Sequence, residues 1–243
     1  MVRKITFILL LILIYSCKTI SVGDDNQVTT TQNIMLGMIG EDQQFILERD
    51  YNHTAIPVYN HPLKVQWNIQ HFNKSTYKFF SKAAINQNTQ FSIDYSDSLL
   101  NKPQFLKLEL SDRVSILNAL NSKINKEIKD YIFNKKDAHL ITSISIALDK
   151  NRLKELLNAD EVFLEATGVK SYALKTYKKG ELQTVLSFNE GVIFAYKASN
   201  FCWQENDKHQ LEIVDIVEST NRCPNKTYRS ATRAKKKINY YKL

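Results

Sequence analysis

The chain has 243 residues, of which 43% are hydrophobic and 24% charged, and its formal net charge is +8. With 6 Gly and 4 Pro, this composition excludes a fibrous repeat protein and a disordered linker protein. A basic balance is compatible with nucleic-acid binding, but Lys, Asn and Ile are abundant throughout the chain and form no single basic patch. We therefore expect no nucleic-acid partner, and an anionic lipid or polysaccharide is the better match to the charge.

The first residues have the pattern of an export signal. Arg3 and Lys4 are followed by an apolar run over residues 5–14, interrupted only by Thr6. This run is too short to cross about 30 Å of hydrocarbon as a helix, and it has the length of the apolar region of a signal peptide. The run ends in the sequence Ile-Tyr-Ser-Cys at residues 14–17, which resembles the lipobox of bacterial lipoproteins, here of the Bacteroidetes type. The alternatives are an ordinary secretory signal cut elsewhere and an uncleaved helix.

The resemblance implies a lipid anchor. Residues 1–16 would be removed as the signal peptide, and Cys17 would become the first mature residue. Its sulfur would carry a diacylglyceryl group and its amine a further acyl chain such as palmitate. Two acyl chains give stable anchoring, so the resemblance implies a lipid bilayer as partner and the outer membrane of a Gram-negative cell envelope as location.

Residues 17–33 are polar and have little periodicity, which predicts a flexible tether. Residues 34–223 are interpreted as a single α+β domain. The stretch 224–243 carries seven Lys or Arg and no acid. Because it has no strong apolar stripe, we expect a mobile basic extension that the fold does not need.

The domain contains both kinds of periodicity. Residues 34–58 predict short strands and turns, and residues 64–72 alternate strictly, as a half-buried strand does. Further predicted segments are a short helix at 76–84, strands at 91–95 and 105–110, a long helix at 111–133, a strand at 139–148 and a short helix at 149–157. Strands at 162–166, 171–177, 182–188, 192–198 and 211–217 follow, the first of them separated by short turn signals typical of antiparallel neighbours. The expected fold is α+β, a mostly antiparallel sheet with one long and a few short helices on one face.

The three cysteines divide by position. Cys17 belongs to the lipobox, which leaves Cys202 and Cys223 as an even pair in an oxidising compartment. We predict a disulfide between them, and two free buried thiols are the alternative.

No catalytic or metal-binding motif is present. The five histidines, His53, His61, His71, His139 and His209, have no ligand spacing, and we expect neither a metal nor a cofactor. Asp94 with Asp97, and Asp160 with Glu161, are paired carboxylates at predicted element ends, where capping and turn roles are usual. We therefore expect a non-catalytic binding or structural role, with an envelope protein or polysaccharide as partner. The alternatives are an envelope hydrolase and an accessory subunit of a secretion, uptake or adhesion complex.

Overall fold

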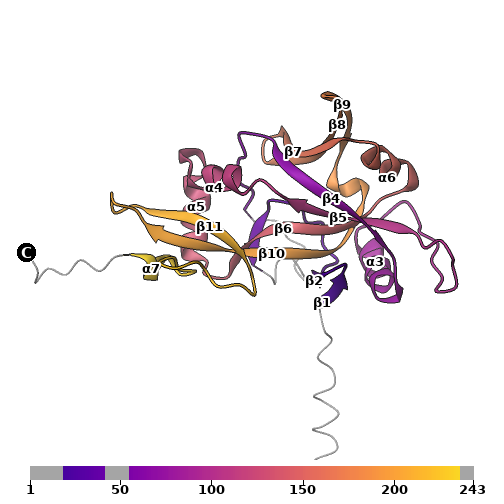
Figure 1. Ribbon diagram of the computed structural model, residues 1–243, viewed down its shortest axis with the longest axis horizontal. Helices are drawn as coiled ribbons and strands as arrows, with labels where there is room; N and C mark the ends of the chain where they lie inside the picture. Colours follow the sequence, from indigo (N-terminus) through magenta and orange to yellow (C-terminus); the bar gives the residue numbers. More distant parts are fainter. Residues whose placement is uncertain (1–18, 42–54, 236–243) are drawn as a thin grey trace, which may run out of the picture.

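The computed structural model describes residues 19–41 and 55–235 (Figure 1). The described chain forms a mostly antiparallel sheet with helices, consistent with the expected α+β class. The strands are β1 (Thr19–Val22), β2 (Asp25–Thr29), β3 (Ile39–Glu41), β4 (Leu63–His71), β5 (Gln104–Leu110), β6 (Ala138–Ala147), β7 (Glu161–Gly168), β8 (Ser171–Lys178), β9 (Glu181–Leu186), β10 (Val192–Glu205) and β11 (Leu211–Glu218). The helices are α3 (Lys74–Asn86), α4 (Arg113–Asn121), η2 (Lys123–Asn125), α5 (Lys126–Asn134), α6 (Lys150–Leu157), η3 (Phe188–Glu190) and α7 (Ala231–Ala234).

The strand order is β1-β2-β10-β6-β5-β4-β7-β8-β9, with β11 also on β10 and β3 also on β6. The long β10 therefore has β6 along one side, and β2 followed by β11 along the other. The strands β7, β8 and β9 form the antiparallel series expected from their short turns. The chain then leaves β9 and crosses to the middle of the sheet, since β10 pairs with β6.

Each face of the sheet has its own packed cluster. Leu106 belongs to the larger cluster, which is mostly aliphatic and includes residues of α4, α5 and α6. Its neighbour Phe105 belongs to the second cluster, which α3 covers with Phe80 and Ala83. Successive residues of a strand point to opposite faces, so the helices contribute to both faces. The expectation of helices on one face is not confirmed.

The predicted long helix over 111–133 is interrupted at Ser122, whose backbone is extended. Asn125 explains the break, because its buried side chain makes hydrogen bonds with main-chain groups that a continuous helix would pair with one another or leave to solvent. Its amide donates to the carbonyls of Ala119 and Val58, each at 2.8 Å, and accepts from the Val58 N–H at 2.8 Å. A side chain that competes for backbone hydrogen bonds in this way favours a helix boundary.

Residues 19–29 are a β-hairpin in the sheet, which corrects the tether prediction for the described part of 17–33. The reason lies in two contacts that are distant in sequence. Ile20 and Val22 are buried beneath α3, and Gln27 is fully buried, donating to Ser143 Oγ at 3.3 Å and accepting from Ser145 Oγ at 2.6 Å.

The described part of the basic stretch 224–243 is also packed on the domain, contrary to the expectation of a mobile extension. Tyr228 and Trp203 exchange main-chain hydrogen bonds of 2.9 and 2.7 Å. Ala231 and Ala234 of α7 are buried in the larger cluster. Two small side chains are enough for this contact. The absence of an apolar stripe in the sequence therefore did not predict whether the segment packs on the domain. Residues 236–243 lie outside the described residues.

Candidate functional site

A cleft of about 1040 Å³ opens at the end of the sheet where β4 stops and β5 begins. The long connection between α3 and β5, residues 87–103, forms one wall, and the start of α6 forms the other. The lining residues are His71, Phe91, Ser92, Ile93, Asp94, Leu99, Leu100, Asn101, Lys102, Pro103, Gln104, Leu148, Asp149, Lys150, Asn151 and Leu153. A cleft of this size, with apolar side chains and a few convergent polar groups, is the usual form of a binding site.

The loop wall has no regular secondary structure, so the strand predicted at 91–95 is wrong. Its first half is held on α3 by aromatic contacts. Tyr77 stacks on Tyr95 with ring centroids 4.7 Å apart, and the Tyr77 hydroxyl donates to the Ile93 carbonyl at 3.1 Å. The Tyr95 hydroxyl donates to Asp97, and this hydrogen bond raises the pKa of Tyr95 to about 12. Loops of this length inside compact domains are commonly functional.

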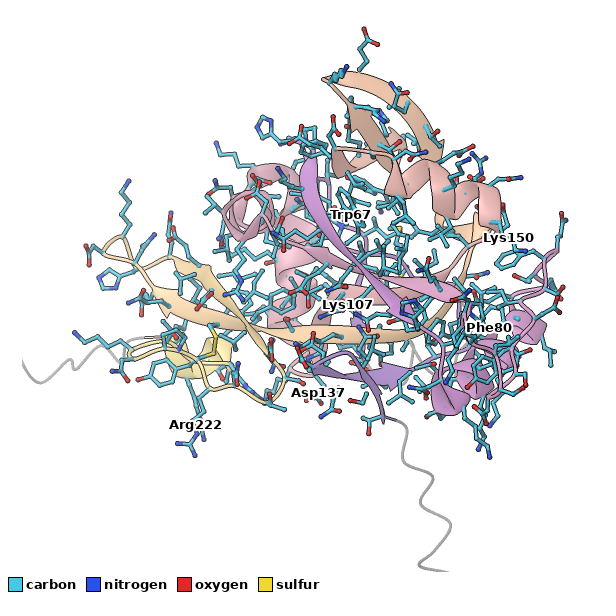
Figure 2. All side chains as sticks on the ribbon, turned by 45° about the vertical axis from the view of Figure 1, so that its right-hand side comes forward. Trp67, Phe80, Lys107, Asp137, Lys150 and Arg222 are labelled. Carbon is cyan, nitrogen blue, oxygen red and sulfur yellow. A yellow bond between two sulfur atoms is a disulfide. The ribbon has the colours of Figure 1, made fainter. Side chains whose placement is uncertain are left out.

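The opposite wall is formed by the start of α6, and Asp149 caps this helix. This agrees with the helix predicted to begin at residue 149. The Asp149 carboxylate accepts from the backbone N–H groups of Asn151 and Arg152 at 2.8 and 3.2 Å, which caps α6. Leu148 and Leu153 supply the apolar surface of this wall. The Asp149 carboxylate is thus committed to the helix, and its neighbour Lys150, labelled in Figure 2, also lines the cleft.

The main chain of β4 alternates between two directions. The Lys64 carbonyl accepts a hydrogen bond from the Ser111 N–H at 3.0 Å, and the Phe72 N–H donates to the Pro103 carbonyl at 2.9 Å. In an antiparallel pair, alternate residues direct their N–H and C=O groups to the same neighbour. The even-numbered residues of β4 therefore bond to β5, and the odd-numbered residues direct these groups to the other side.

On that other side the sheet is incomplete. Leu63 and Val65 face β7, but the register ends at Val65. Among the described residues no strand continues along Trp67, Ile69 and His71, so these three have outward main-chain groups without a strand partner. Trp67 is half-buried, Ile69 is 40% exposed, and His71 lines the cleft. The open edge of β4, residues 67–71, therefore ends in the cleft.

The titratable groups of the cleft do not form a hydrogen-bonded catalytic chain in the described part of the protein. His71 Nε2 lies 3.3 Å from Gln104 Nε2, and Asp149 caps α6. Three of the paired carboxylates noted in the sequence have structural partners, whereas Asp94 lines the cleft. Asp97 accepts from Tyr95, Asp160 accepts from the Lys179 N–H at 2.9 Å, and Glu161 pairs with Lys64 at 2.9 Å.

Of the remaining histidines, His209 lies 2.9 Å from Glu205, and His53 lies outside the described residues. Within residues 19–41 and 55–235 no three or more His, Cys, Asp or Glu side chains are grouped so as to hold a metal ion.

The predicted disulfide between Cys202 and Cys223 is confirmed, with Cα atoms 5.7 Å apart. It joins β10 to the segment that follows β11. Cys17, the predicted lipidation site, lies outside the described residues. In the described ranges no helix is long and apolar enough to cross a membrane.

A second hollow of about 240 Å³ was not anticipated from the sequence. Asn200 and His139 line it from β10 and β6. Asn200 Nδ2 and His139 Nδ1 are buried and have no hydrogen-bond partner in the described residues. Their proximity depends on the pairing of two strands about sixty positions apart, for which the sequence carries no local signal. Comparison with protein-family models, with curated proteins and with solved structures finds no match to this chain.

Proposed function

We propose that the chain is an acyl-anchored lipoprotein of the cell envelope, and that its cleft binds an extended polypeptide segment without catalysis. The observation that carries the binding role is the open edge of β4, which leads directly into the cleft. An extended segment can join such an edge through main-chain hydrogen bonds, while pockets for alternate side chains supply selectivity. The lipobox at residues 14–17 supports the anchor.

The chemistry of the cleft defines the segment further. Leu99, Leu100 and Pro103 offer apolar contacts from the loop wall. Lys102, Lys150 and Asp94 all line the cleft, so the cleft carries both signs of charge. The preferred ligand is therefore an uncharged or mixed-charge strand with an apolar side chain near its centre. Binding of this kind suits an accessory subunit of an envelope complex, which holds a segment of another protein.

The test uses Ile69, whose N–H points away from β5. Ile69→Pro removes one outward donor and leaves the bonds between β4 and β5 in place, because Pro is tolerated on an open edge. Ile69→Val is the matched control that keeps the donor. A library of displayed random peptides is selected on the detergent-purified full chain, and the enriched peptides are titrated against each variant.

We expect binding to Ile69→Pro to be weaker by about tenfold, the effect of one unsatisfied hydrogen bond, and binding to Ile69→Val to be unchanged. Leu100→Asp alters an almost fully exposed cleft residue and should also weaken binding. Equal affinity for the wild type, Ile69→Pro and Leu100→Asp would refute the proposed site.

A further inference from the structure

The outer face of α3 combines lysines with exposed apolar side chains. Lys74, Lys78 and Lys82 recur every four residues, so they lie along one side of the helix. All three are exposed, and the helix contains no acid. Ile85 is 78% exposed one turn beyond, and Lys82 lies over the half-buried Phe79 ring at 5.9 Å. Side chains of this kind suit the boundary between lipid headgroups and acyl chains.

The opposite, buried side of α3 packs against the strand that is nearest in sequence to the proposed anchor. Ile20 and Val22 of β1 pack in the same cluster as Phe80 and Ala83 of α3. Figure 1 shows α3 next to the β1–β2 hairpin, with β7, β8 and β9 on the opposite side of the view. The helix and the hairpin are therefore neighbours at one side of the domain.

The ends of the two elements are aligned. Thr19 pairs with Val28 at the open end of the hairpin, and the chain then reaches Gln32. Gln87, the C-cap of α3, donates to the Gln32 carbonyl at 3.2 Å. The C-terminal end of α3, with Lys82 and Ile85, is thus at the same end of the hairpin as Thr19.

The covalent chain limits how far this end can be from the bilayer. Thr19 is two residues after Cys17, and two residues span at most about 7 Å. An acyl group on Cys17 would hold the start of β1 at the level of the lipid headgroups. The connection is thus too short to let the start of β1 move far from the lipid.

We infer that the α3 face, defined by Lys74, Lys78, Lys82, Phe79 and Ile85, contacts the anionic headgroups of the bilayer that holds the Cys17 acyl chains. This inference rests on the acyl anchor of the proposed function. Each lysine at an anionic surface favours contact on the order of fivefold. The contact orients the domain, and the β7–β9 end of the molecule is directed away from the lipid.

The experiment places an environment-sensitive fluorophore at Ile85→Cys in the lipidated full chain. The introduced thiol is the free one, because Cys202 and Cys223 are joined and Cys17 is acylated. The chain is reconstituted in vesicles of phosphatidylcholine alone or with phosphatidylglycerol, and quenching by brominated lipid reports contact. Val169→Cys, 95% exposed in the turn between β7 and β8, is the control label position.

We expect the label at residue 85 to be quenched more in anionic vesicles than in neutral ones. The label at residue 169 should be quenched in neither kind of vesicle. Replacing Lys74, Lys78 and Lys82 by Gln should lower the anionic preference about fivefold per lysine. The control triple of Lys123→Gln, Lys126→Gln and Lys154→Gln removes the same charge from exposed positions on other helices. It should leave the preference unchanged.

Two outcomes would overturn the contact. One is equal quenching of the label at residue 85 in both kinds of vesicle, and the other is an equal loss of the preference for anionic vesicles in the two triple variants. Retention of the chain on neutral vesicles in about 1 M salt, where the Debye length is roughly 3 Å, separately reports the anchor. A chain that leaves the vesicles refutes the anchor, whereas a retained chain with an unresponsive label refutes the α3 contact alone.

Discussion

The two faces of the central sheet are packed by different means. The face that contains Leu106 carries a continuous, mostly aliphatic cluster under α4, α5 and α6. The face that contains Phe105 has aromatic packing under α3 at one end and ion pairs at its centre, where Figure 2 labels Lys107. A face closed by apolar side chains can be recognised from periodicity, but a face closed by charges depends on a partner from elsewhere in the chain.

That partner is Asp25 of the β1–β2 hairpin. Its carboxylate pairs with Lys107 and, at 2.9 Å, with Lys197, which also reaches Glu218 at 2.7 Å. The hydrogen bond from Lys107 holds the pKa of Asp25 below its usual range, against the opposing effect of burial. For Lys197, burial disfavours the charged form, but the bonds to Glu218 and Asp25 outweigh it and raise the pKa. These ion pairs thus add to the apolar contacts and hydrogen bonds that hold the hairpin on the sheet.

The largest loss of stability is expected from a substitution in the aromatic packing on the face that contains Phe105. The fully buried Phe72 contacts Phe80, Phe105 and Phe194 at ring-centroid distances of 5.3, 4.8 and 5.8 Å. Phe72→Ala should lower the free energy of unfolding by about 3–5 kcal/mol, and Leu106→Ala on the other face by about 2–5 kcal/mol. Denaturant titration of both variants measures this. A negligible loss for Phe72→Ala alone would show that the α3 face is not a packed core.

The disulfide should matter almost as much. Cys202 and Cys223 are 21 residues apart, and loss of a native bridge of this kind costs about 2–4 kcal/mol. The double variant Cys202→Ser with Cys223→Ser should show this loss in denaturant titration, and the wild type should show it on reduction. A double variant as stable as the oxidised wild type would mean that the main-chain pairing of Tyr228 with Trp203 is sufficient to hold this segment.

The ion pairs at the centre of the second face predict a pH dependence. Because the pKa of Asp25 is lowered in the folded protein, its contribution to stability is complete above the unfolded pKa of about 3.9 and is lost as the pH falls through the folded value. Asp25→Asn should therefore lower the free energy of unfolding at neutral pH by about 1.5–3 kcal/mol. Denaturant titration across acidic pH should show the wild type and the variant converging. A constant difference at all pH values would exclude the carboxylate as its cause.

The C-terminal segment should have a smaller effect. Truncation after Asn225 removes the pairing of Tyr228 with Trp203 and the burial of Ala231 and Ala234, and should lower the free energy of unfolding by about 1–3 kcal/mol. Thermal unfolding measures this, with Lys226→Gln as a control for the loss of charge. An unchanged melting temperature would restore the original expectation of a dispensable extension.

The regular elements with strong periodicity were predictable. The strand predicted at residues 64–72 and the helix beginning at Asp149 both appear in the structure. The alternating burial expected of the strand holds as far as Trp67 and is lost at Ile69 and His71, which are exposed. The hairpin over 19–29 was not predictable, since Asp25 and Gln27 are polar residues whose partners lie far away in sequence. The long helix was predicted across Ser122 because its apolar spacing continues there, while the break depends on the contact of Asn125 with Val58.

The cleft could not be read from the sequence for a similar reason. Its walls come from residues 87–103 and 148–153, and His71 comes from the end of β4. Each segment alone resembles an ordinary loop or helix start. The open edge of β4 is also invisible in the sequence, because it depends on where the register with β7 ends.

The proposed acyl group at Cys17 matters most, because an anchor there would determine both the location of the protein and which face meets the bilayer. Cells expressing the full chain or its Cys17→Ala variant are grown with a labelled palmitate analogue, and the protein is recovered from detergent-solubilised membranes. We expect label on the wild type, none on Cys17→Ala, and a mature amino terminus at Cys17. Equal labelling of the two proteins, or an amino terminus elsewhere, would contradict the proposed anchor.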